Sequence, residues 1–410
     1  MNAFNPSRRG LLATAAGFGL SVQLLGVPAM AADSDLNRRK VVVIICRGGM
    51  DGLSVAPPVG DGEYKGLRGD LAIQNALPLD GTFSLHPQLT SVHALAKAGE
   101  ARIVPAIATP DRARSHFEAQ DVLESGAAGV YSVSSGWLNR TVETLSAHRK
   151  VDAISIGATA PLILRGKLQT ASWSPGRGVD TAARLPSLLQ DLYRHDALLG
   201  PALAKGLATQ DMAKDALAGM GATSQMTAAP SAGPPGRGGA QQGREASRQL
   251  GTALAGFMRE PHGPTVAAIS LDGFDSHAGQ AALIATRLAA LDAVLDGLHT
   301  GLGPEWKNTV VLVATEFGRT ARANGTGGTD HGTASTALVL GGALKPGGIV
   351  GDWPGLKQTA LYENRDVAPT LDMRGLFKGV LAEHMGIDRA VLDAAIFPNS
   401  ASARPVAGLV

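Results

Sequence analysis

The sequence predicts a three-layer α/β/α sandwich with a mostly parallel central sheet. Short apolar runs rich in β-branched residues alternate along the chain with longer segments of helical periodicity. The runs are apolar at nearly every position, as expected for strands that helices cover on both faces. Alternation of strands and helices over this length is typical of such a fold.

Six segments are predicted strands. The first is a continuous run of valine and isoleucine that ends just before two glycines, and the others are comparable apolar runs. They span residues 41–45, 101–108, 151–156, 265–271, 309–314 and 336–340.

Six further segments have helical periodicity and alternate with the strands. They span residues 89–98, 115–125, 138–148, 184–199, 281–298 and 367–385. Residues 221–244 interrupt the pattern, because they are rich in Gly and Pro and have few apolar side chains to bury. We expect a flexible insertion there, within a single domain that spans residues 33–410, although a linker between two domains has the same composition.

The N-terminus has the pattern of an export signal, which we assign to residues 1–32. Arg8 and Arg9 precede an uncharged stretch of small and apolar residues, which ends in Ala29-Met30-Ala31. Paired arginines indicate the twin-arginine pathway, with that translocase as a partner and the periplasm as destination. A membrane anchor is the alternative, but the apolar run is short for a span, and no later segment is apolar enough for one.

Composition excludes several classes of protein. The formal net charge is +2, and the two signal arginines account for it, so the mature chain is close to neutral and is not expected to bind nucleic acid. Cys46 is the single cysteine, so no disulfide can form within the chain. It lies in an apolar run, and we expect it to be a buried small residue.

Polar residues that follow the predicted strands are the candidates for a functional site, because sites in parallel α/β sheets form at the carboxyl ends of strands. Together they supply carboxylates and imidazoles, the ligand types of a divalent metal ion, and a serine able to act as nucleophile. The candidates are Asp51, Arg114, Ser115, His116, Asp275, His277, Glu316, Arg319, Asp330 and His331.

Each candidate also has a structural interpretation. Asp51 can instead cap the segment that follows it. Glu316 and Arg319 can form an ion pair, and His116 can be a packed core histidine. An isolated Asp-x-His, as in residues 275–277, is more often a cap or a surface pair than a metal site.

The motifs resemble a family, domain-of-unknown-function family 1501, whose members commonly carry twin-arginine signals. The resemblance rests on Arg47-Gly-Gly-Met-Asp-Gly, Arg114-Ser-His-Phe-Glu, Gly273-Phe-Asp-Ser-His, Glu316-Phe-Gly-Arg-Thr and Gly328-Thr-Asp-His-Gly. That family is grouped with the alkaline phosphatase and sulfatase superfamily. The resemblance therefore implies an alkaline phosphatase-like fold and hydrolysis of phosphate or sulfate esters at one or two metal ions.

Carried over to this sequence, the resemblance implies a role for each candidate. Asp275, His277 and His331 would hold one metal ion, zinc, manganese or calcium, with Asp272 as a substitute ligand. Asp51 and Glu316 would support a second ion. The pair Asp330-His331 is an alternative position for the Asp-His motif. In the usual position, Phe317 stands where a histidine is common, so one histidine ligand of a two-metal centre is missing.

The resulting hypothesis is an exported metal-dependent hydrolase of phosphate or sulfate esters. Ser115 would attack the ester, beside His116, and Arg47, Arg114 or Arg319 would offset charge on the transferring group. The competing hypothesis is a non-catalytic periplasmic binding or assembly protein on the same fold, favoured by the missing ligand and the long insertion.

Overall fold

The computed structural model describes residues 36–147, 151–156, 161–173, 193, 196, 199–218 and 237–410. Apart from Leu36, these residues belong to one compact unit, Asn37–Val410. The predicted export signal lies outside the described residues. So does most of the predicted helix 184–199, of which Tyr193, Asp196 and Leu199 are described.

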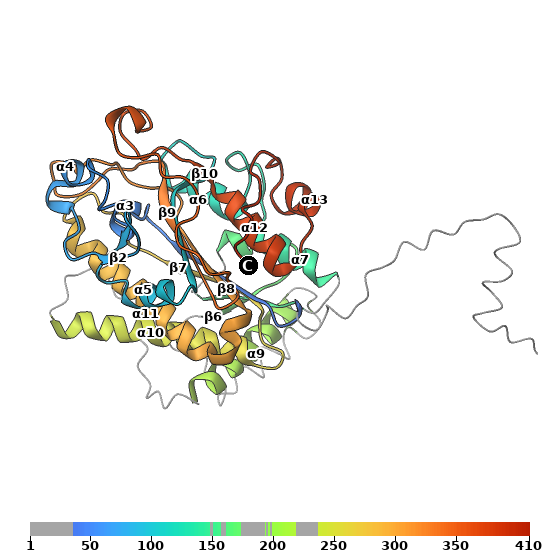
Figure 1. Cartoon of the computed structure of the whole chain (residues 1–410). Coiled ribbons are helices and arrows are strands. Elements are labelled where there is room, and N and C mark those ends of the chain that lie inside the picture. Colours follow the sequence, from blue (N-terminus) through green and yellow to red (C-terminus); the bar gives the residue numbers. More distant parts are fainter. Residues whose placement is uncertain are drawn as a thin grey trace, which may run out of the picture. The chain divides into compact units, whose positions relative to one another are not determined.

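A central sheet of eight strands organises this unit, in the order β10-β4-β9-β8-β1-β7-β5-β6 (Figure 1). All six predicted strands are present within one or two residues of their predicted ends. The strands are β1 (Lys40–Cys46), β4 (Ala101–Ala108), β5 (Ala153–Ile156), β6 (Ala171–Trp173), β7 (Val266–Leu271), β8 (Thr309–Ala314), β9 (Ser335–Leu340) and β10 (Leu371–Asp372). A separate two-stranded ribbon pairs β2 (Leu77–Pro78) with β3 (Ser84–Leu85).

The sheet is mostly parallel, as predicted. β1 pairs in parallel with both β7 and β8, and β5 with both β6 and β7. β9 is antiparallel to its neighbours β4 and β8. Because of this reversal, the start of β9 lies at the same edge of the sheet as the carboxyl ends of β4 and β8.

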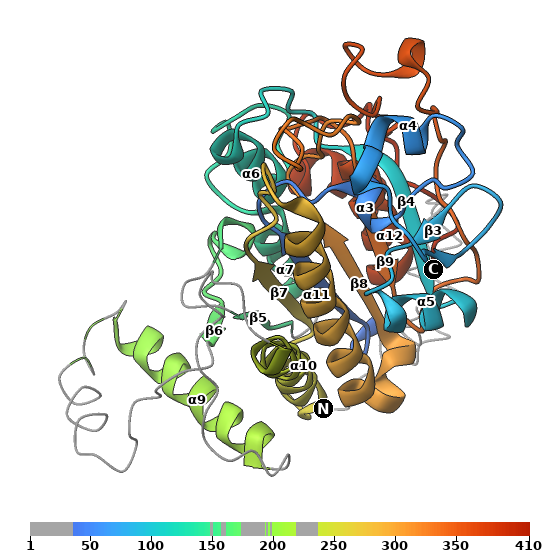
Figure 2. The same cartoon turned by 90° about the vertical axis from the view of Figure 1, so that its left-hand side faces the viewer.

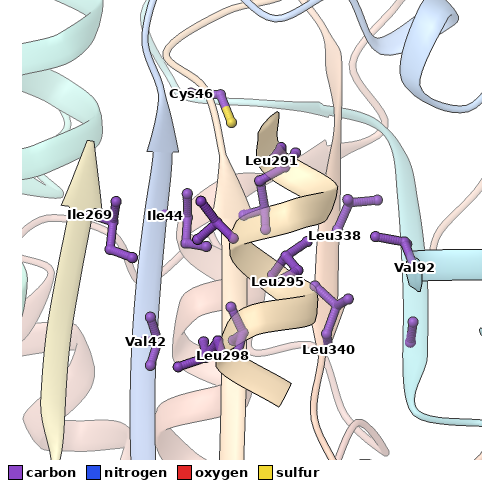
Figure 3. Packing of buried hydrophobic residues seen from close by; sticks show 14 of the residues in the cluster. Val42, Ile44, Cys46, Val92, Ile269, Leu291, Leu295, Leu298, Leu338 and Leu340 are labelled. Atoms are coloured by element: carbon purple, nitrogen blue, oxygen red, sulfur yellow. The ribbon is translucent and has the colours of Figure 1, made fainter. Parts of the chain in front are cut away.

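Helices cover both faces of the sheet, and each face packs against its own large apolar cluster. Alternate residues of β1 face opposite ways: Val42 and Ile44 belong to one apolar cluster, and Val41 and Val43 to another. The first cluster includes side chains of α5 (Thr90–Lys97), α10 (Arg237–Arg259) and α11 (Gln280–Leu302), and Figure 3 shows part of it. The second includes side chains of α6 (His116–Ser125), α7 (Trp137–Ser146) and α12 (Met373–Met385). The predicted three-layer arrangement is confirmed.

Helices α10 and α11 lie side by side on one face (Figure 2), and glycines let their backbones approach closely. A Cβ built on Gly251 of α10 would overlap the carbonyl oxygen of Val294, and one on Gly297 of α11 would overlap that of Arg248. The sequence analysis did not predict α10, and the start of this helix at Arg237 shows that the predicted insertion was drawn too long at its C-terminal end. Residues 237–244, assigned to the flexible insertion, are the first turns of this helix. Apolar side chains of its later turns, such as Leu254 and Phe257, pack in the cluster on the sheet and anchor the helix. The rest of the predicted insertion, residues 221–236, lies outside the described residues.

The remaining elements are short, apart from α9 (Leu199–Ala218), which was also not predicted. The short helices are α3 (Gly52–Val55), α4 (Tyr64–Arg68), α13 (Arg389–Val391), η2 (Gly69–Leu71), η3 (Leu162–Leu164), η4 (Gly303–Asn308), η5 (Gln358–Ala360) and η6 (Leu392–Ile396). Among the described residues, none of the helices has the length and hydropathy needed to cross a membrane.

Candidate metal centre

One edge of the sheet gathers the predicted site residues. The loops after β1, β4, β7 and β8 all begin at this edge, and the segment that enters β9 ends there. Gly48, after β1, allows the first of these loops to touch the third. It has a φ of +115°, and a Cβ on it would overlap the backbone nitrogen of Asp275.

Three of the predicted metal ligands, Asp275, His277 and His331, form a compact group. His277 Nε2 lies 3.0 Å from His331 Nε2 and 3.1 Å from Asp275 Oδ1. His331 Nε2 lies 3.4 Å from the same carboxylate oxygen. Residues from two distant parts of the chain thus point their donor atoms at a common position.

His116, predicted as a catalytic residue, joins this group from the start of α6. Its Nε2 lies 3.5 Å from Asp275 Oδ2, and one atom each from His116, Asp275 and His331 lie within 4.8 Å of one another. The His116 Nε2 atom is buried and has no hydrogen-bond partner among the described residues. We call His116, Asp275, His277 and His331 the metal-site residues.

Hydrogen bonds at Nδ1 fix the tautomer of each imidazole. Glu316 Oε1 lies 2.9 Å from His116 Nδ1, and Asp330 Oδ1 lies 3.3 Å from His277 Nδ1. The carbonyl oxygen of Arg114 lies 2.9 Å from His331 Nδ1. Since carboxylates and carbonyls only accept, each Nδ1 carries a proton, and each Nε2 presents a lone pair when the ring is neutral.

These lone pairs require a positive charge between them. Two neutral Nε2 atoms 3.0 Å apart, beside the carboxylate of Asp275, repel one another unless a proton or a metal ion lies between them. The separations of 3.0–3.5 Å fit a metal ion, because metal–ligand distances of about 2.0–2.1 Å give about 3.3–3.4 Å between tetrahedral ligands. The group therefore suits one divalent ion: the ligand atoms of His116, Asp275 and His331 all lie within 4.8 Å of one another, and His277 Nε2 lies beside Asp275 and His331.

Phe317, which occupies the position where a ligand histidine was expected, packs against the imidazoles instead. Its ring centroid is 4.8 Å from that of His116 and 4.8 Å from that of His331. The side chain is buried. Phe317 therefore limits how far either ring can turn away from the common position.

Glu316 and Asp330, both predicted as ligands, lie behind the imidazoles. Glu316 is fully buried, and its Oε1 also accepts from Gly48 N at 2.8 Å and from Gln120 Nε2 at 3.2 Å. Its Oε2 accepts from the Thr315 hydroxyl. Asp330 is exposed and shares its Oδ1 between His277 and Asn324. The two carboxylates orient ligands rather than supply them.

Asp51, the other predicted ligand, belongs to a separate buried group. Its Oδ2 forms an ion pair with Arg68, accepts from Gln280 Nε2 at 2.6 Å and accepts from the hydroxyl of Ser54. Asp51 and Arg68 are both almost wholly buried. A guanidinium thus balances this carboxylate, and among the described residues no histidine lies in the group.

Arg319 was predicted to offset charge on a substrate, but its side chain is fully buried and its donors are used within the protein. It donates to four carbonyl oxygens, those of Gly48, Gly49, Phe274 and Thr329. Its Nη2 also lies 2.5 Å from Asp275 Oδ1. Arg319 therefore holds three loops together and orients a metal-site residue.

Arg114 and Ser115 directly precede His116 in the chain, and the carbonyl oxygen of Arg114 contacts His331. Ser115 is the residue before α6, directly preceding His116, and its hydroxyl has no hydrogen-bond partner among the described residues. Arg114 has a φ of +57° and pairs with Glu363 and Asp366. The sequence analysis did not identify four residues that support the site, because their partners are distant in the chain and no local pattern indicates these contacts. They are Asp366, Arg68, Gln280 and Gln120.

The surroundings shift the proton equilibria of the group in different directions. The hydrogen bond to Glu316 raises the pKa of His116. Burial lowers the pKa of His331, and the charge of Arg319 adds to this effect. Burial by itself would raise the pKa of the Asp275 and Glu316 carboxyls. The hydrogen bond from Arg319 to Asp275 and the one from His116 to Glu316 outweigh burial and leave each pKa below its usual value.

The motifs and the site place the chain in a family: it belongs to the proteins of unknown function called DUF1501, whose model matches residues 86–396. This confirms the family resemblance drawn from the sequence. No protein with a curated description matches the chain.

Solved structures with some likeness include hydrolases. A phosphonate monoester hydrolase of Agrobacterium radiobacter is 12% identical over 85% of this chain and 74% of its own, with a TM-score of 0.40. The zinc complex of the C-terminal periplasmic domain of EcEptC from Escherichia coli is 9% identical over 74% and 72%, with a TM-score of 0.35. A magnesium-bound mutant of TAB5 alkaline phosphatase is 12% identical over 76% and 93%, with a TM-score of 0.31.

Proposed function

We propose that this chain is an exported hydrolase of phosphate or sulfate esters that uses one divalent metal ion. The observation that carries the proposal is the group of His116, Asp275 and His331, whose ligand atoms lie within 4.8 Å of one another, with His277 Nε2 beside it and each imidazole held at its Nδ1. His116, Asp275, His277 and His331 would be the ligands. When bound, such an ion polarises an ester oxygen and stabilises the negative charge that develops during hydrolysis.

The ligand types favour zinc or manganese over calcium. Calcium prefers six to eight oxygen ligands, whereas imidazoles predominate in this group. A second ion has no comparable place among the described residues, because Arg68 engages Asp51, and His116 engages Glu316. The proposal is therefore a one-metal site, in place of the two-metal centre that the sequence left open.

Ser115 is the proposed nucleophile. Its position next to His116 keeps it close to the metal-site residues, and no histidine or carboxylate accepts its proton among the described residues. Activation by a metal ion, rather than by a paired general base, matches this arrangement. Attack by Ser115 Oγ on phosphorus or sulfur forms the serine ester and breaks the bond to the leaving alkoxide; the serine proton passes to water, and the alkoxide takes a proton from water. A water molecule then hydrolyses the serine ester, which releases phosphate or sulfate and restores the serine hydroxyl.

The three arginines first considered for charge stabilisation all have protein partners. Arg47 pairs with Glu124, Arg114 with Asp366, and Arg319 with Asp275. Each is thus neutralised by a carboxylate, and the proposal assigns none of them to the substrate. Export through the twin-arginine pathway remains part of the proposal and rests on Arg8 and Arg9.

The test combines metal analysis with turnover. The mature protein, purified from the periplasm, should contain about one equivalent of zinc or manganese and should hydrolyse an aryl phosphate or an aryl sulfate. Ser115→Ala should keep the metal and lose turnover, and Ser132→Ala, an exposed serine in the loop after α6, is the matched control. A stably folded mature protein that binds no divalent metal and turns over neither ester refutes the proposal and favours a binding or assembly role.

A further inference from the structure

Asp366 is a buried carboxylate that joins two segments of the metal site. It is fully buried, and its Oδ2 lies 2.9 Å from Arg114 Nε and 2.7 Å from Arg114 Nη2. The hydroxyl of Thr333 donates to the same oxygen at 2.9 Å. Arg365 Nη1 reaches the other oxygen, at 3.4 Å.

Both donors to Oδ2 lie close in the chain to metal-site residues. Arg114 is two residues before His116, and its carbonyl oxygen accepts from His331 Nδ1 at 2.9 Å. Thr333 is two residues after His331. One carboxylate oxygen therefore controls the separation of the segments that carry His116 and His331.

The backbone around Asp366 reinforces this connection. Thr320 forms an antiparallel bridge with Asp366, and its N–H donates to the carbonyl oxygen of Asp330 at 3.0 Å. The segment before His331 is thus held through Thr320 to the segment of Asp366. Arg114 has a left-handed backbone, with a φ of +57°, which is costly for a non-glycine residue and persists only where surrounding contacts enforce it.

We infer that Asp366 is a positioning residue for the metal site, which it serves by holding the Arg114 carbonyl against His331 and by fixing the distance between His116 and His331. This role rests on the proposed function, because it presumes the metal ion. Asp366 does not contact the metal-site side chains itself. Its effect passes through Arg114 and Thr333, so its loss should loosen the site without removing a ligand.

Three variants separate positioning from simple stability. Asp366→Asn keeps the volume and one acceptor but removes the charge that holds the Arg114 guanidinium. Thr333→Val removes one hydrogen bond and keeps the shape. Glu363→Gln is the matched control, since Glu363 also pairs with Arg114 but its side chain is 55% exposed, where ion pairs contribute little.

The probe is Co²⁺ added to the metal-free full-length mature protein, read by its visible absorption and by competition with a chelator. Asp366→Asn should bind Co²⁺ about 10- to 100-fold more weakly, with a changed absorption band that reports altered ligand geometry. Thr333→Val should bind about two- to tenfold more weakly, and Glu363→Gln should bind within about twofold of the unmodified protein.

Two results would overturn the inference. If Asp366→Asn binds Co²⁺ with unchanged affinity and spectrum while its melting temperature falls, Asp366 is only structural, and the proposed metal site stands. If Asp366→Asn does not fold, unchanged Co²⁺ affinity in Thr333→Val has the same meaning.

If the unmodified protein binds no Co²⁺, the proposed function fails, and imidazole ¹⁵N NMR of the metal-free protein decides the positioning role. A protected His331 Nδ1–H that is lost in Asp366→Asn supports it. The same Nδ1–H signal in both proteins overturns it.

Discussion

Glu316→Gln isolates the contribution of a buried negative charge to metal binding. The glutamine oxygen can take the place of Oε1 and keep the hydrogen bonds from His116 and Gly48. The amide nitrogen then faces Thr315 Oγ1, whose proton can turn from Glu316 Oε2 to the carbonyl oxygen of Cys46, so that the hydroxyl oxygen accepts from that nitrogen. The hydrogen bonds survive this substitution, and only the charge is lost.

The size of the effect follows from that difference. A hydrogen bond to a charged group contributes about 1.5–3 kcal/mol, and a neutral one about 0.5–1.5 kcal/mol. The loss is thus about 1–1.5 kcal/mol, which corresponds to about a tenfold weaker affinity for the metal ion. This lies at the lower end of the 10- to 100-fold range that is typical when a partner behind a ligand histidine is changed.

The affinity is measured by titrating the metal-free protein with Zn²⁺ against a chelator of known affinity. Glu143→Gln is the control, because Glu143 pairs with the exposed Lys167 outside the site. An unchanged Zn²⁺ affinity in Glu316→Gln, with Glu143→Gln equally unchanged, would refute the idea that Glu316 supports His116 as a ligand.

Three further predictions concern the metal, the backbone and pH. Removal of the metal by a chelator should lower the free energy of unfolding by about 4 kcal/mol, if the ion was present at 1,000 times its Kd; His331→Ala should unfold at the same denaturant concentration with or without chelator. Gly48→Ala should lower the free energy of unfolding by about 1–3 kcal/mol, since the residue has a φ of +115° and no room for a Cβ, and an unchanged denaturation midpoint would contradict this. Burial lowers the pKa of His86 from 6.5 to about 4, so between these pH values the unfolded chain binds more protons, and stability decreases as the pH is lowered, by at most about 3 kcal/mol. Denaturation at pH 7 and at pH 4.5 should show a smaller loss in His86→Gln than in the unmodified protein, and equal losses would rule out His86 as the cause.

The fold was largely predictable because its strands are buried on both faces. The ends of β4 and β8 were predicted to the residue from unbroken apolar runs. The direction of β9 was not predictable, because an apolar strand reads the same whichever way it pairs. Helix α10 was missed because its first residues share the Gly and Gln content of the segment before them.

The site was predictable in its residue types but not in each residue's role. Asp275, His277 and His331 were predicted as a ligand set, and the structure brings them together. Asp51 and Glu316 carry carboxylates as a metal ligand does, but Asp51 pairs with Arg68 and Glu316 bonds to His116. His116 is 200 residues from Glu316 in the chain, and no local pattern encodes such a pairing.

The reversed direction of β9 has a consequence for how the site can change. Because β8 ends and β9 begins at the same edge, residues 315–334 leave the sheet and return to it without crossing either face. This single excursion carries one metal-site residue, His331, together with Glu316, Phe317 and Arg319. The segment also packs Ala321 and Ala334 into a buried apolar cluster, so a substitution that changes its path would displace a ligand together with the residues that orient the others.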